Sequence, residues 1–249
     1  MTAPESPSGA VASVLVTGFE PFGGMAHNPS WDVAAAVAER AEAGVLVAQQ
    51  AEAGTPIGVN RAGGSRGRKV QVQALRLPVV YGRAGQALAE ALDAAAEQGR
   101  APDVVVSLGL AAGTPGVRLE RVGVNLRDAR IPDNDGAQPC DVPVVPDAEG
   151  ALFSTLRLKA AHQRIQDAGI PVQLSLSAGS FVCNDLLYSL LHDVRSRGLA
   201  ARAGFIHIPD VQSPDSPVSL EQAVQAVDLV IAESLQAGSD AERPGGALH

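Results

Sequence analysis

Short apolar runs alternate along this chain with segments whose apolar residues recur every three or four positions. The runs VLVT at 14–17 and DVVVSL at 103–108 are β-branched and almost continuously apolar, which is typical of buried strands. The longer segments are rich in Ala and Leu at helical spacing. The pattern predicts strands at 14–17, 70–77, 103–108, 117–126, 172–176 and 205–208, and helices at 29–43, 86–98, 151–168, 185–197 and 218–236.

The order of these elements predicts an α/β fold. Strands that alternate with helices and read as continuous apolar runs favour a mainly parallel sheet covered on both faces. In such sheets binding sites lie at the carboxyl ends of the strands. The last helix carries its own start signal, because Ser219 is followed three residues later by Gln222, the spacing of a capping box.

The chain is predicted to form a single domain at 13–237. Residues 1–12 and 238–249 are small and polar and contain Pro and Gly, as flexible tails usually do. Three segments interrupt the alternation, at 18–28, 43–69 and 128–150, and loops of such length inside a domain are usually functional or disordered. The segment 43–69 is locally basic, and we expect a mobile insertion, either a surface hairpin or a loop; a segment that gates the site or contacts another subunit is the alternative interpretation.

Composition narrows the class of protein. The formal charge of −8 argues against nucleic acid as a partner, because phosphate binding needs a basic surface. Apolar runs are strand-sized and residues 1–13 lack the features of a secretory signal, so neither a membrane span nor secretion is expected. With only two cysteines in 249 residues, a reducing cytoplasm fits best. Spacings typical of metal sites or phosphate-binding loops are absent from the sequence, and no metal or cofactor is expected.

Cys183 stands at the junction between a predicted strand and a predicted helix. The strand ends near residue 176, a turn covers 177–181, and Asn184 or Asp185 is the expected helix cap. The positive end of the helix dipole and its unpaired N–H groups would favour a thiolate at this position. A buried Cys that acts only as a small apolar side chain is the alternative interpretation.

His207 is the best candidate for a base that would serve this thiol. It lies in the short apolar strand 205–208, where an imidazole is costly unless it is paired. A structural His bonded to a carbonyl group remains an alternative. A third group is needed to orient the ring. Glu120 interrupts a strand-like segment, but spacing alone ranks it only slightly above Asp210.

Several sequence blocks together resemble the pyroglutamyl peptidase I family of cysteine peptidases, also called pyrrolidone carboxyl peptidases. They extend from about Val14 to about Pro209, and their combination is highly specific. The blocks are VLVTGFEPFGG at 14–24, NPSW at 28–31, LPVVYGRA at 77–84, ERVGVNLRDARIPDNDGAQP at 120–139, AGSFVCN at 178–184 and GFIHIP at 204–209.

The resemblance implies a three-layer α/β/α sandwich without a cofactor, usually a homotetramer, that cleaves N-terminal pyroglutamate from peptides. It also implies that Cys183 is the nucleophile, His207 the base and Glu120 the residue that orients it. Arg130 is expected near the reacting carbonyl group. The substrate pocket is expected to be formed by Phe19, Phe22, Leu110, Ile131, Phe181 and Val182.

The sequence departs from the family pattern at three places, one of which is the segment 43–69, longer than the family's usual segment. Many family members have His where this chain has Asp185, and a charge so close to Cys183 would oppose thiolate formation. Bacterial members often have Gln where this chain has Leu110, a mild change if the family contact is made by the backbone. Two other functions remain open, namely a different cysteine amidase or acyl transferase, and a weakly catalytic protein that binds pyroglutamyl peptides.

Overall fold

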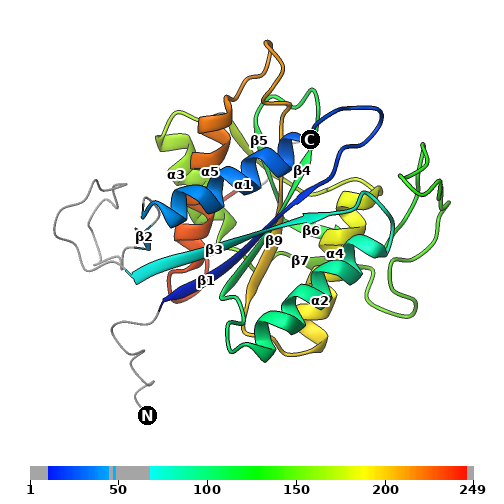
Figure 1. Cartoon of the computed structure of the whole chain (residues 1–249), viewed down its shortest axis with the longest axis horizontal. Coiled ribbons are helices and arrows are strands. Elements are labelled where there is room, and N and C mark those ends of the chain that lie inside the picture. Colours follow the sequence, from blue (N-terminus) through cyan, green and yellow to red (C-terminus); the bar gives the residue numbers. More distant parts are fainter. Residues whose placement is uncertain (1–10, 45–46, 49–67, 246–249) are drawn as a thin grey trace.

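A mixed β-sheet lies at the centre of the computed structural model, which describes residues 11–44, 47–48 and 68–245 (Figure 1). Within this part of the chain the sheet has seven strands in the order β2-β3-β1-β4-β9-β5-β8. The strands are β1 (Ala12–Phe19), β2 (Val47–Ala48), β3 (Arg68–Leu77), β4 (Val104–Leu110), β5 (Val117–Glu120), β8 (Val172–Ser175) and β9 (Arg202–Ile208).

Strand direction decides where the loops gather. Strands β3, β1, β4 and β9 are mutually parallel, whereas β2 is antiparallel to β3 and β5 is antiparallel to β9. The loops that follow the four parallel strands therefore leave the same edge of the sheet. The parallel core and the antiparallel β5 together confirm the predicted α/β fold with a mainly parallel or mixed sheet.

Helices cover both faces of the sheet and make the three layers that the resemblance implied (Figure 1). One face carries α1 (Pro29–Glu42), α3 (Leu158–Asp167) and α5 (Leu220–Ser234). The other carries α2 (Arg83–Glu97) and α4 (Val182–Ser196), with a small sheet of β6 (Val122–Val124) and β7 (Ala151–Phe153) beside α4. The capping box of Ser219 and Gln222 at the start of α5 is confirmed.

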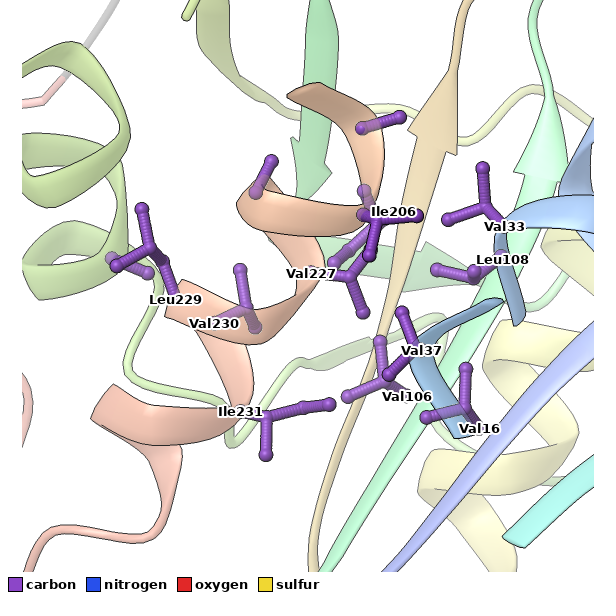
Figure 2. Close-up of a cluster of buried hydrophobic side chains, with 14 of the residues drawn as sticks. Val16, Val33, Val37, Val106, Leu108, Ile206, Val227, Leu229, Val230 and Ile231 are labelled. Carbon is purple, nitrogen blue, oxygen red and sulfur yellow. The ribbon is translucent and has the colours of Figure 1, made fainter. Parts of the chain in front are cut away.

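Alternate strand residues serve the two faces. Val16, Val106 and Ile206 pack against α1 and α5, where they meet Val37 and Val227 in a dry aliphatic cluster (Figure 2). Their neighbours in sequence point to the opposite face, toward α2 and α4. Because side chains alternate along a strand, the face toward α4 is left to residues such as Phe205 and His207.

Several predicted element boundaries are wrong, and α2 and β9 each begin three residues earlier than predicted. The predicted strand 117–126 is two strands in two sheets, β5 and β6, separated at Arg121. The predicted helix 151–168 begins as β7, which pairs with β6, and only Leu158–Asp167 is helical. Helix α4 starts at Val182, earlier than the predicted 185. The expected insertion 43–69 lies mostly outside the described residues; its ends include β2, which pairs with the start of β3.

Candidate active site

His207 and Glu120 form a buried pair on neighbouring strands. In the antiparallel pairing of β5 with β9, Glu120 stands opposite Phe205, and its side chain shares a face with His207. The His207 Nδ1–H donates to Glu120 Oε1 at 2.8 Å. Glu120 is fully buried and His207 is 6% exposed. The sequence prediction that His207 needs a partner is confirmed, and that partner is Glu120.

Cys183 is the second residue of α4. Phe181 is the N-cap residue, and its side chain makes no capping hydrogen bond. The first amide groups of a helix have no intrahelical acceptor, so the amides of Val182 and Cys183 remain available as donors. The expected cap by Asn184 or Asp185 is wrong, but the prediction that Cys183 lies at the start of a helix is confirmed.

Gly109 on β4 makes room for the sulfur of Cys183. Gly109 is the register partner of His207 on the adjacent parallel strand. A Cβ added to Gly109 would lie 2.9 Å from Cys183 Sγ and 2.7 Å from the ring of Phe205. The thiol therefore sits directly over the missing side chain, next to His207. Sequence reasoning missed Gly109, because its role depends on strand register and on the position of α4.

Electrostatics favour a protonated His207. Burial by itself would lower the pKa of His207, but the Cys183 thiolate, through its charge and a hydrogen bond, and the Glu120 carboxylate raise this pKa to about 9. A ring with negative partners on both sides is more stable as an imidazolium. The arrangement therefore favours a protonated ring on His207 at neutral pH, beside the sulfur of Cys183.

The two residues after Cys183 anchor the start of α4. The Asn184 amide accepts from Val124 N–H at 2.9 Å and donates to the carbonyl oxygens of Val124 and Leu126, each at 2.9 Å. The Asp185 carboxylate accepts from Arg127 Nε at 2.5 Å. These bonds explain why neither side chain caps the helix. The ion pair with Arg127 also offsets the charge of Asp185 that was expected to oppose the thiolate.

Carboxylates also hold the segment that follows β3. Gly82 N–H donates to Asp185 Oδ2 at 2.8 Å, and Tyr81 N–H donates to Asp133 Oδ2 at 2.9 Å. Val79 N–H donates to Glu20 Oε1 at 3.2 Å. Three separate parts of the chain thus fix the backbone of one short segment, and this segment presents Tyr81 to the site.

Aromatic rings gather beside Cys183. The ring centroids of Phe22 and Phe181 are 5.4 Å apart, and Tyr81 meets Phe181 edge-on, also at 5.4 Å. Phe19 and Val182 are buried in the same apolar cluster. Burial, followed by the nearby Asp185 and Asp133 carboxylates, raises the pKa of Tyr81, so its hydroxyl stays neutral. Tyr81 was missed as a site residue, although its sequence block was noted.

The other predicted pocket residues are less enclosed. Leu110 is half-buried at the carboxyl end of β4, and Ile131 is 51% exposed. Arg130 is exposed and forms no hydrogen bond or ion pair within the described part of the chain. Their roles in binding stay predictions. The second thiol, Cys140, is exposed on the long loop.

Residues 11–44, 47–48 and 68–245 contain neither a helix that could span a membrane nor a cluster of side chains that could hold a metal ion. None of the helices among the described residues combines the length and apolarity that a bilayer crossing requires. Over the same residues, His, Cys, Asp and Glu side chains do not gather in groups of three or more that could hold an ion.

Comparisons with known proteins identify the family of this chain. The family model for pyroglutamyl peptidase matches residues 54–237. The chain is 38% identical over 242 residues to the pyrrolidone-carboxylate peptidase of Erwinia tasmaniensis and 39% identical over 244 residues to that of Streptomyces coelicolor; each match covers 95% of this chain and 99% of the relative.

Solved structures with the same kind of name are also similar to this chain. Pyroglutamyl peptidase I from Bacillus amyloliquefaciens superposes with a TM-score of 0.75 at 29% identity, covering 94% of this chain and all of that one. A mutant pyrrolidone carboxyl peptidase from Pyrococcus furiosus superposes with a TM-score of 0.70 at 33% identity, covering 90% of this chain and 98% of that one. The chain therefore belongs to the pyroglutamyl peptidase family of cysteine-type hydrolases.

Proposed function

We propose that this protein removes N-terminal pyroglutamate from peptides, with Cys183 as the nucleophile, His207 as the acid–base group and Glu120 as the residue that orients it. The observation that carries the proposal is the buried bond between His207 Nδ1 and Glu120 Oε1 at 2.8 Å, with Cys183 at the uncapped start of α4. Membership of the family supports the choice of substrate.

The first half of the reaction acylates the enzyme. The Cys183 thiolate attacks the carbonyl carbon of the pyroglutamyl residue, and a tetrahedral oxyanion forms. Amide groups in the first turn of α4, with Arg130 as an additional donor, stabilise this oxyanion. The His207 imidazolium gives its proton to the departing amine, so the C–N bond breaks and a thioester remains on Cys183.

The second half releases the product. Neutral His207 takes a proton from water, and the oxygen of this water attacks the thioester carbonyl carbon. The C–S bond then breaks, free pyroglutamate leaves, and Cys183 returns to its thiolate beside protonated His207. Glu120 holds the ring in one tautomer throughout, which keeps Nε2 directed to the reacting atoms.

The pocket suits the substrate because pyroglutamate is a lactam without a free α-amino group. A site for it needs no carboxylate to hold an ammonium ion and can be largely apolar with few polar contacts. The rings of Phe22, Phe181 and Tyr81 supply such a surface beside Cys183. We assign Phe19 and Val182 to support these rings, and Leu110 and Ile131 to close the pocket from the loops.

Release of a fluorescent amine from an L-pyroglutamyl amide tests the proposal. Turnover by the wild type and its loss in Cys183→Ala are expected, whereas Cys140→Ala, which removes the other thiol, should leave the rate unchanged. The matching glutaminyl amide should be a poor substrate, because its free amine and open chain do not fit an apolar lactam pocket. A folded, reduced wild type that cleaves only the glutaminyl amide would instead indicate a different cysteine amidase.

Three features implied at the outset remain predictions. A single domain predicts one cooperative unfolding transition for residues 13–237. A homotetramer predicts about four times the chain mass in light scattering. A cytoplasmic location predicts activity in the soluble fraction of source cells, without any requirement for a disulfide bond.

A further inference from the structure

Arg118 lies on β5 two residues before Glu120, and the proposed mechanism gives it no role. In the pairing of β5 with β9, Arg118 is the register partner of His207. Its Nε lies 3.3 Å from Glu120 Oε1, the same oxygen that accepts the hydrogen bond from His207. One carboxylate oxygen thus has two cationic neighbours, and only one of them is a proposed catalytic residue.

The same side chain also reaches the turn that leads to Cys183. Arg118 Nη2 donates to Ser175 Oγ at 2.6 Å and to the Ser177 carbonyl oxygen at 3.0 Å. Ser175 ends β8, and Ser177 begins the turn before α4. Arg118 therefore connects the acid of the site to the segment that presents the nucleophile.

The charges around His207 show what this arrangement does. The ionisable and charged groups that face His207 are Glu120 and Arg118 from β5 and Cys183 from α4, while its partner on β4 is Gly109. Glu120 is fully buried, and its Oε2 accepts no hydrogen bond from any described residue. A carboxylate in such a place holds a neighbouring proton tightly unless another cation shares its charge.

We propose that Arg118 is a positioning residue that shares the charge of Glu120, and so sets the pH at which His207 gives up its proton. With Arg118 present, the four groups carry no net charge both as thiol with neutral imidazole and as thiolate with imidazolium. Without it the cluster has one excess negative charge. His207 would then hold its proton to higher pH and would be a weaker acid toward the departing amine.

The inference rests on the proposed function only for its kinetic readout, because alkylation of the Cys183 thiol is measured without turnover. The test replaces Arg118 by Gln and by Lys in a Cys140→Ser background, so that Cys183 is the one thiol that reacts. Arg195→Gln is the matched control. It removes the same charge from an exposed ion pair with Glu149 near the other end of α4.

In Arg118→Gln, the alkaline limb of kcat/KM for the pyroglutamyl amide and the corresponding step in the pH dependence of iodoacetamide alkylation are both expected to move up by about one pH unit. Arg118→Lys keeps the positive charge but loses the planar guanidinium group, which bonds Glu120, Ser175 and Ser177 at once. This variant should therefore keep a pH profile near that of the wild type while its kcat falls severalfold. Arg195→Gln should reproduce the wild-type profile.

The proposal is overturned if a folded Arg118→Gln has the same pH profiles of kcat/KM and of alkylation as the wild type. It is also overturned if Arg195→Gln shifts these profiles by the same amount. If Arg118→Gln does not fold, the decision rests on Arg118→Lys, and a displaced profile there would contradict charge sharing. If the wild type has no turnover, the proposed function fails, and the alkylation profiles still decide the role of Arg118.

Discussion

Substituting Ala for Gly109 tests the packing of the nucleophile without replacing any proposed catalytic residue. A Cβ at this position would meet Phe205 Cζ at 2.7 Å and Cys183 Sγ at 2.9 Å. Comfortable contacts between such atoms are about 3.5–4.0 Å, so the sulfur and the ring have to move by roughly 0.6–1.3 Å. The backbone itself tolerates Ala there, because Gly109 does not adopt a positive φ.

The expected loss follows from that displacement. Moving a reacting atom by about 1 Å can cost about 100-fold in rate, and we expect kcat/KM to fall about 10–100-fold in Gly109→Ala. That loss corresponds to about 1.4–2.7 kcal/mol of transition-state stabilisation. Overpacking should also lower the free energy of unfolding by about 1–3 kcal/mol.

Gly85→Ala is the control for overpacking alone. Gly85 lies on α2, and its added Cβ would lie 3.0 Å from Ser189 Cβ. Ser189 is on α4, the helix that carries Cys183, but six residues after it. Urea unfolding and kinetics with the pyroglutamyl amide should show Gly109→Ala destabilised and slow, and Gly85→Ala with the wild-type kcat/KM. Wild-type kcat/KM in a folded Gly109→Ala would refute the claim that Cys183 Sγ depends on the space above Gly109.

Three further changes give separate outcomes. Glu120→Gln should lower kcat/KM at least 100-fold, and it should move the alkaline limb below the His207 pKa of about 9, because the carboxylate that raises this pKa is gone; an unmoved limb would contradict this. Asn184→Ala should lower the free energy of unfolding by about 3 kcal/mol in urea titrations, since it leaves three partly buried backbone groups near β6 without their bonds to the amide, and a loss near zero would show that water replaces the amide. Burial raises the pKa of Asp228 to about 7, while the nearby Arg40 lowers it and Glu221 raises it, so the native state binds the extra proton. Stability should therefore fall by up to about 1.4 kcal/mol per pH unit from near pH 4 to pH 7, and Asp228→Asn should remove that slope in unfolding titrations.

The central strands could be predicted from the sequence because their apolar runs are long and bounded by turn residues. Strands β4 and β9 and helices α1 and α5 lie where the pattern put them, to within a few residues. The break at Arg121 could not be predicted in the same way, because residues on both sides of it favour strands. Only the contacts of β6 with β7 and α4 separate the two halves into different sheets.

The start of α4 shows how a tertiary contact overrides a local signal. Asn184 and Asp185 are good helix caps in isolation, and the prediction placed the cap there. In the fold their side chains bond instead to the backbone of Val124 and Leu126 and to Arg127, partners about sixty residues earlier in the chain. The helix consequently begins at Val182, and Cys183 falls inside its first turn rather than before it.

The residues of the candidate site also differ in whether local sequence could identify them. Cys183 and His207 could be chosen from local sequence, since each is an unusual residue at the end of a predictable element. Glu120 could be singled out only through the family resemblance, because acidic residues are common and its bond to His207 spans 87 positions. Gly109 and Arg118 became visible only with strand register, which no local pattern encodes.

Side chains alternate across the sheet, so the strand residues that pack the aliphatic cluster face α1 and α5, and those of the candidate site face α4. On β4, Val104, Val106 and Leu108 face the cluster with α1 and α5, while Gly109 lies under the Cys183 thiol. On β9, Ile206 faces that cluster and His207 the other side. The packing that holds the strands in register is therefore built by residues on the face away from Cys183 and His207. This division leaves the face toward α4 free to carry a buried carboxylate, an imidazole and a guanidinium within a few ångströms of one another.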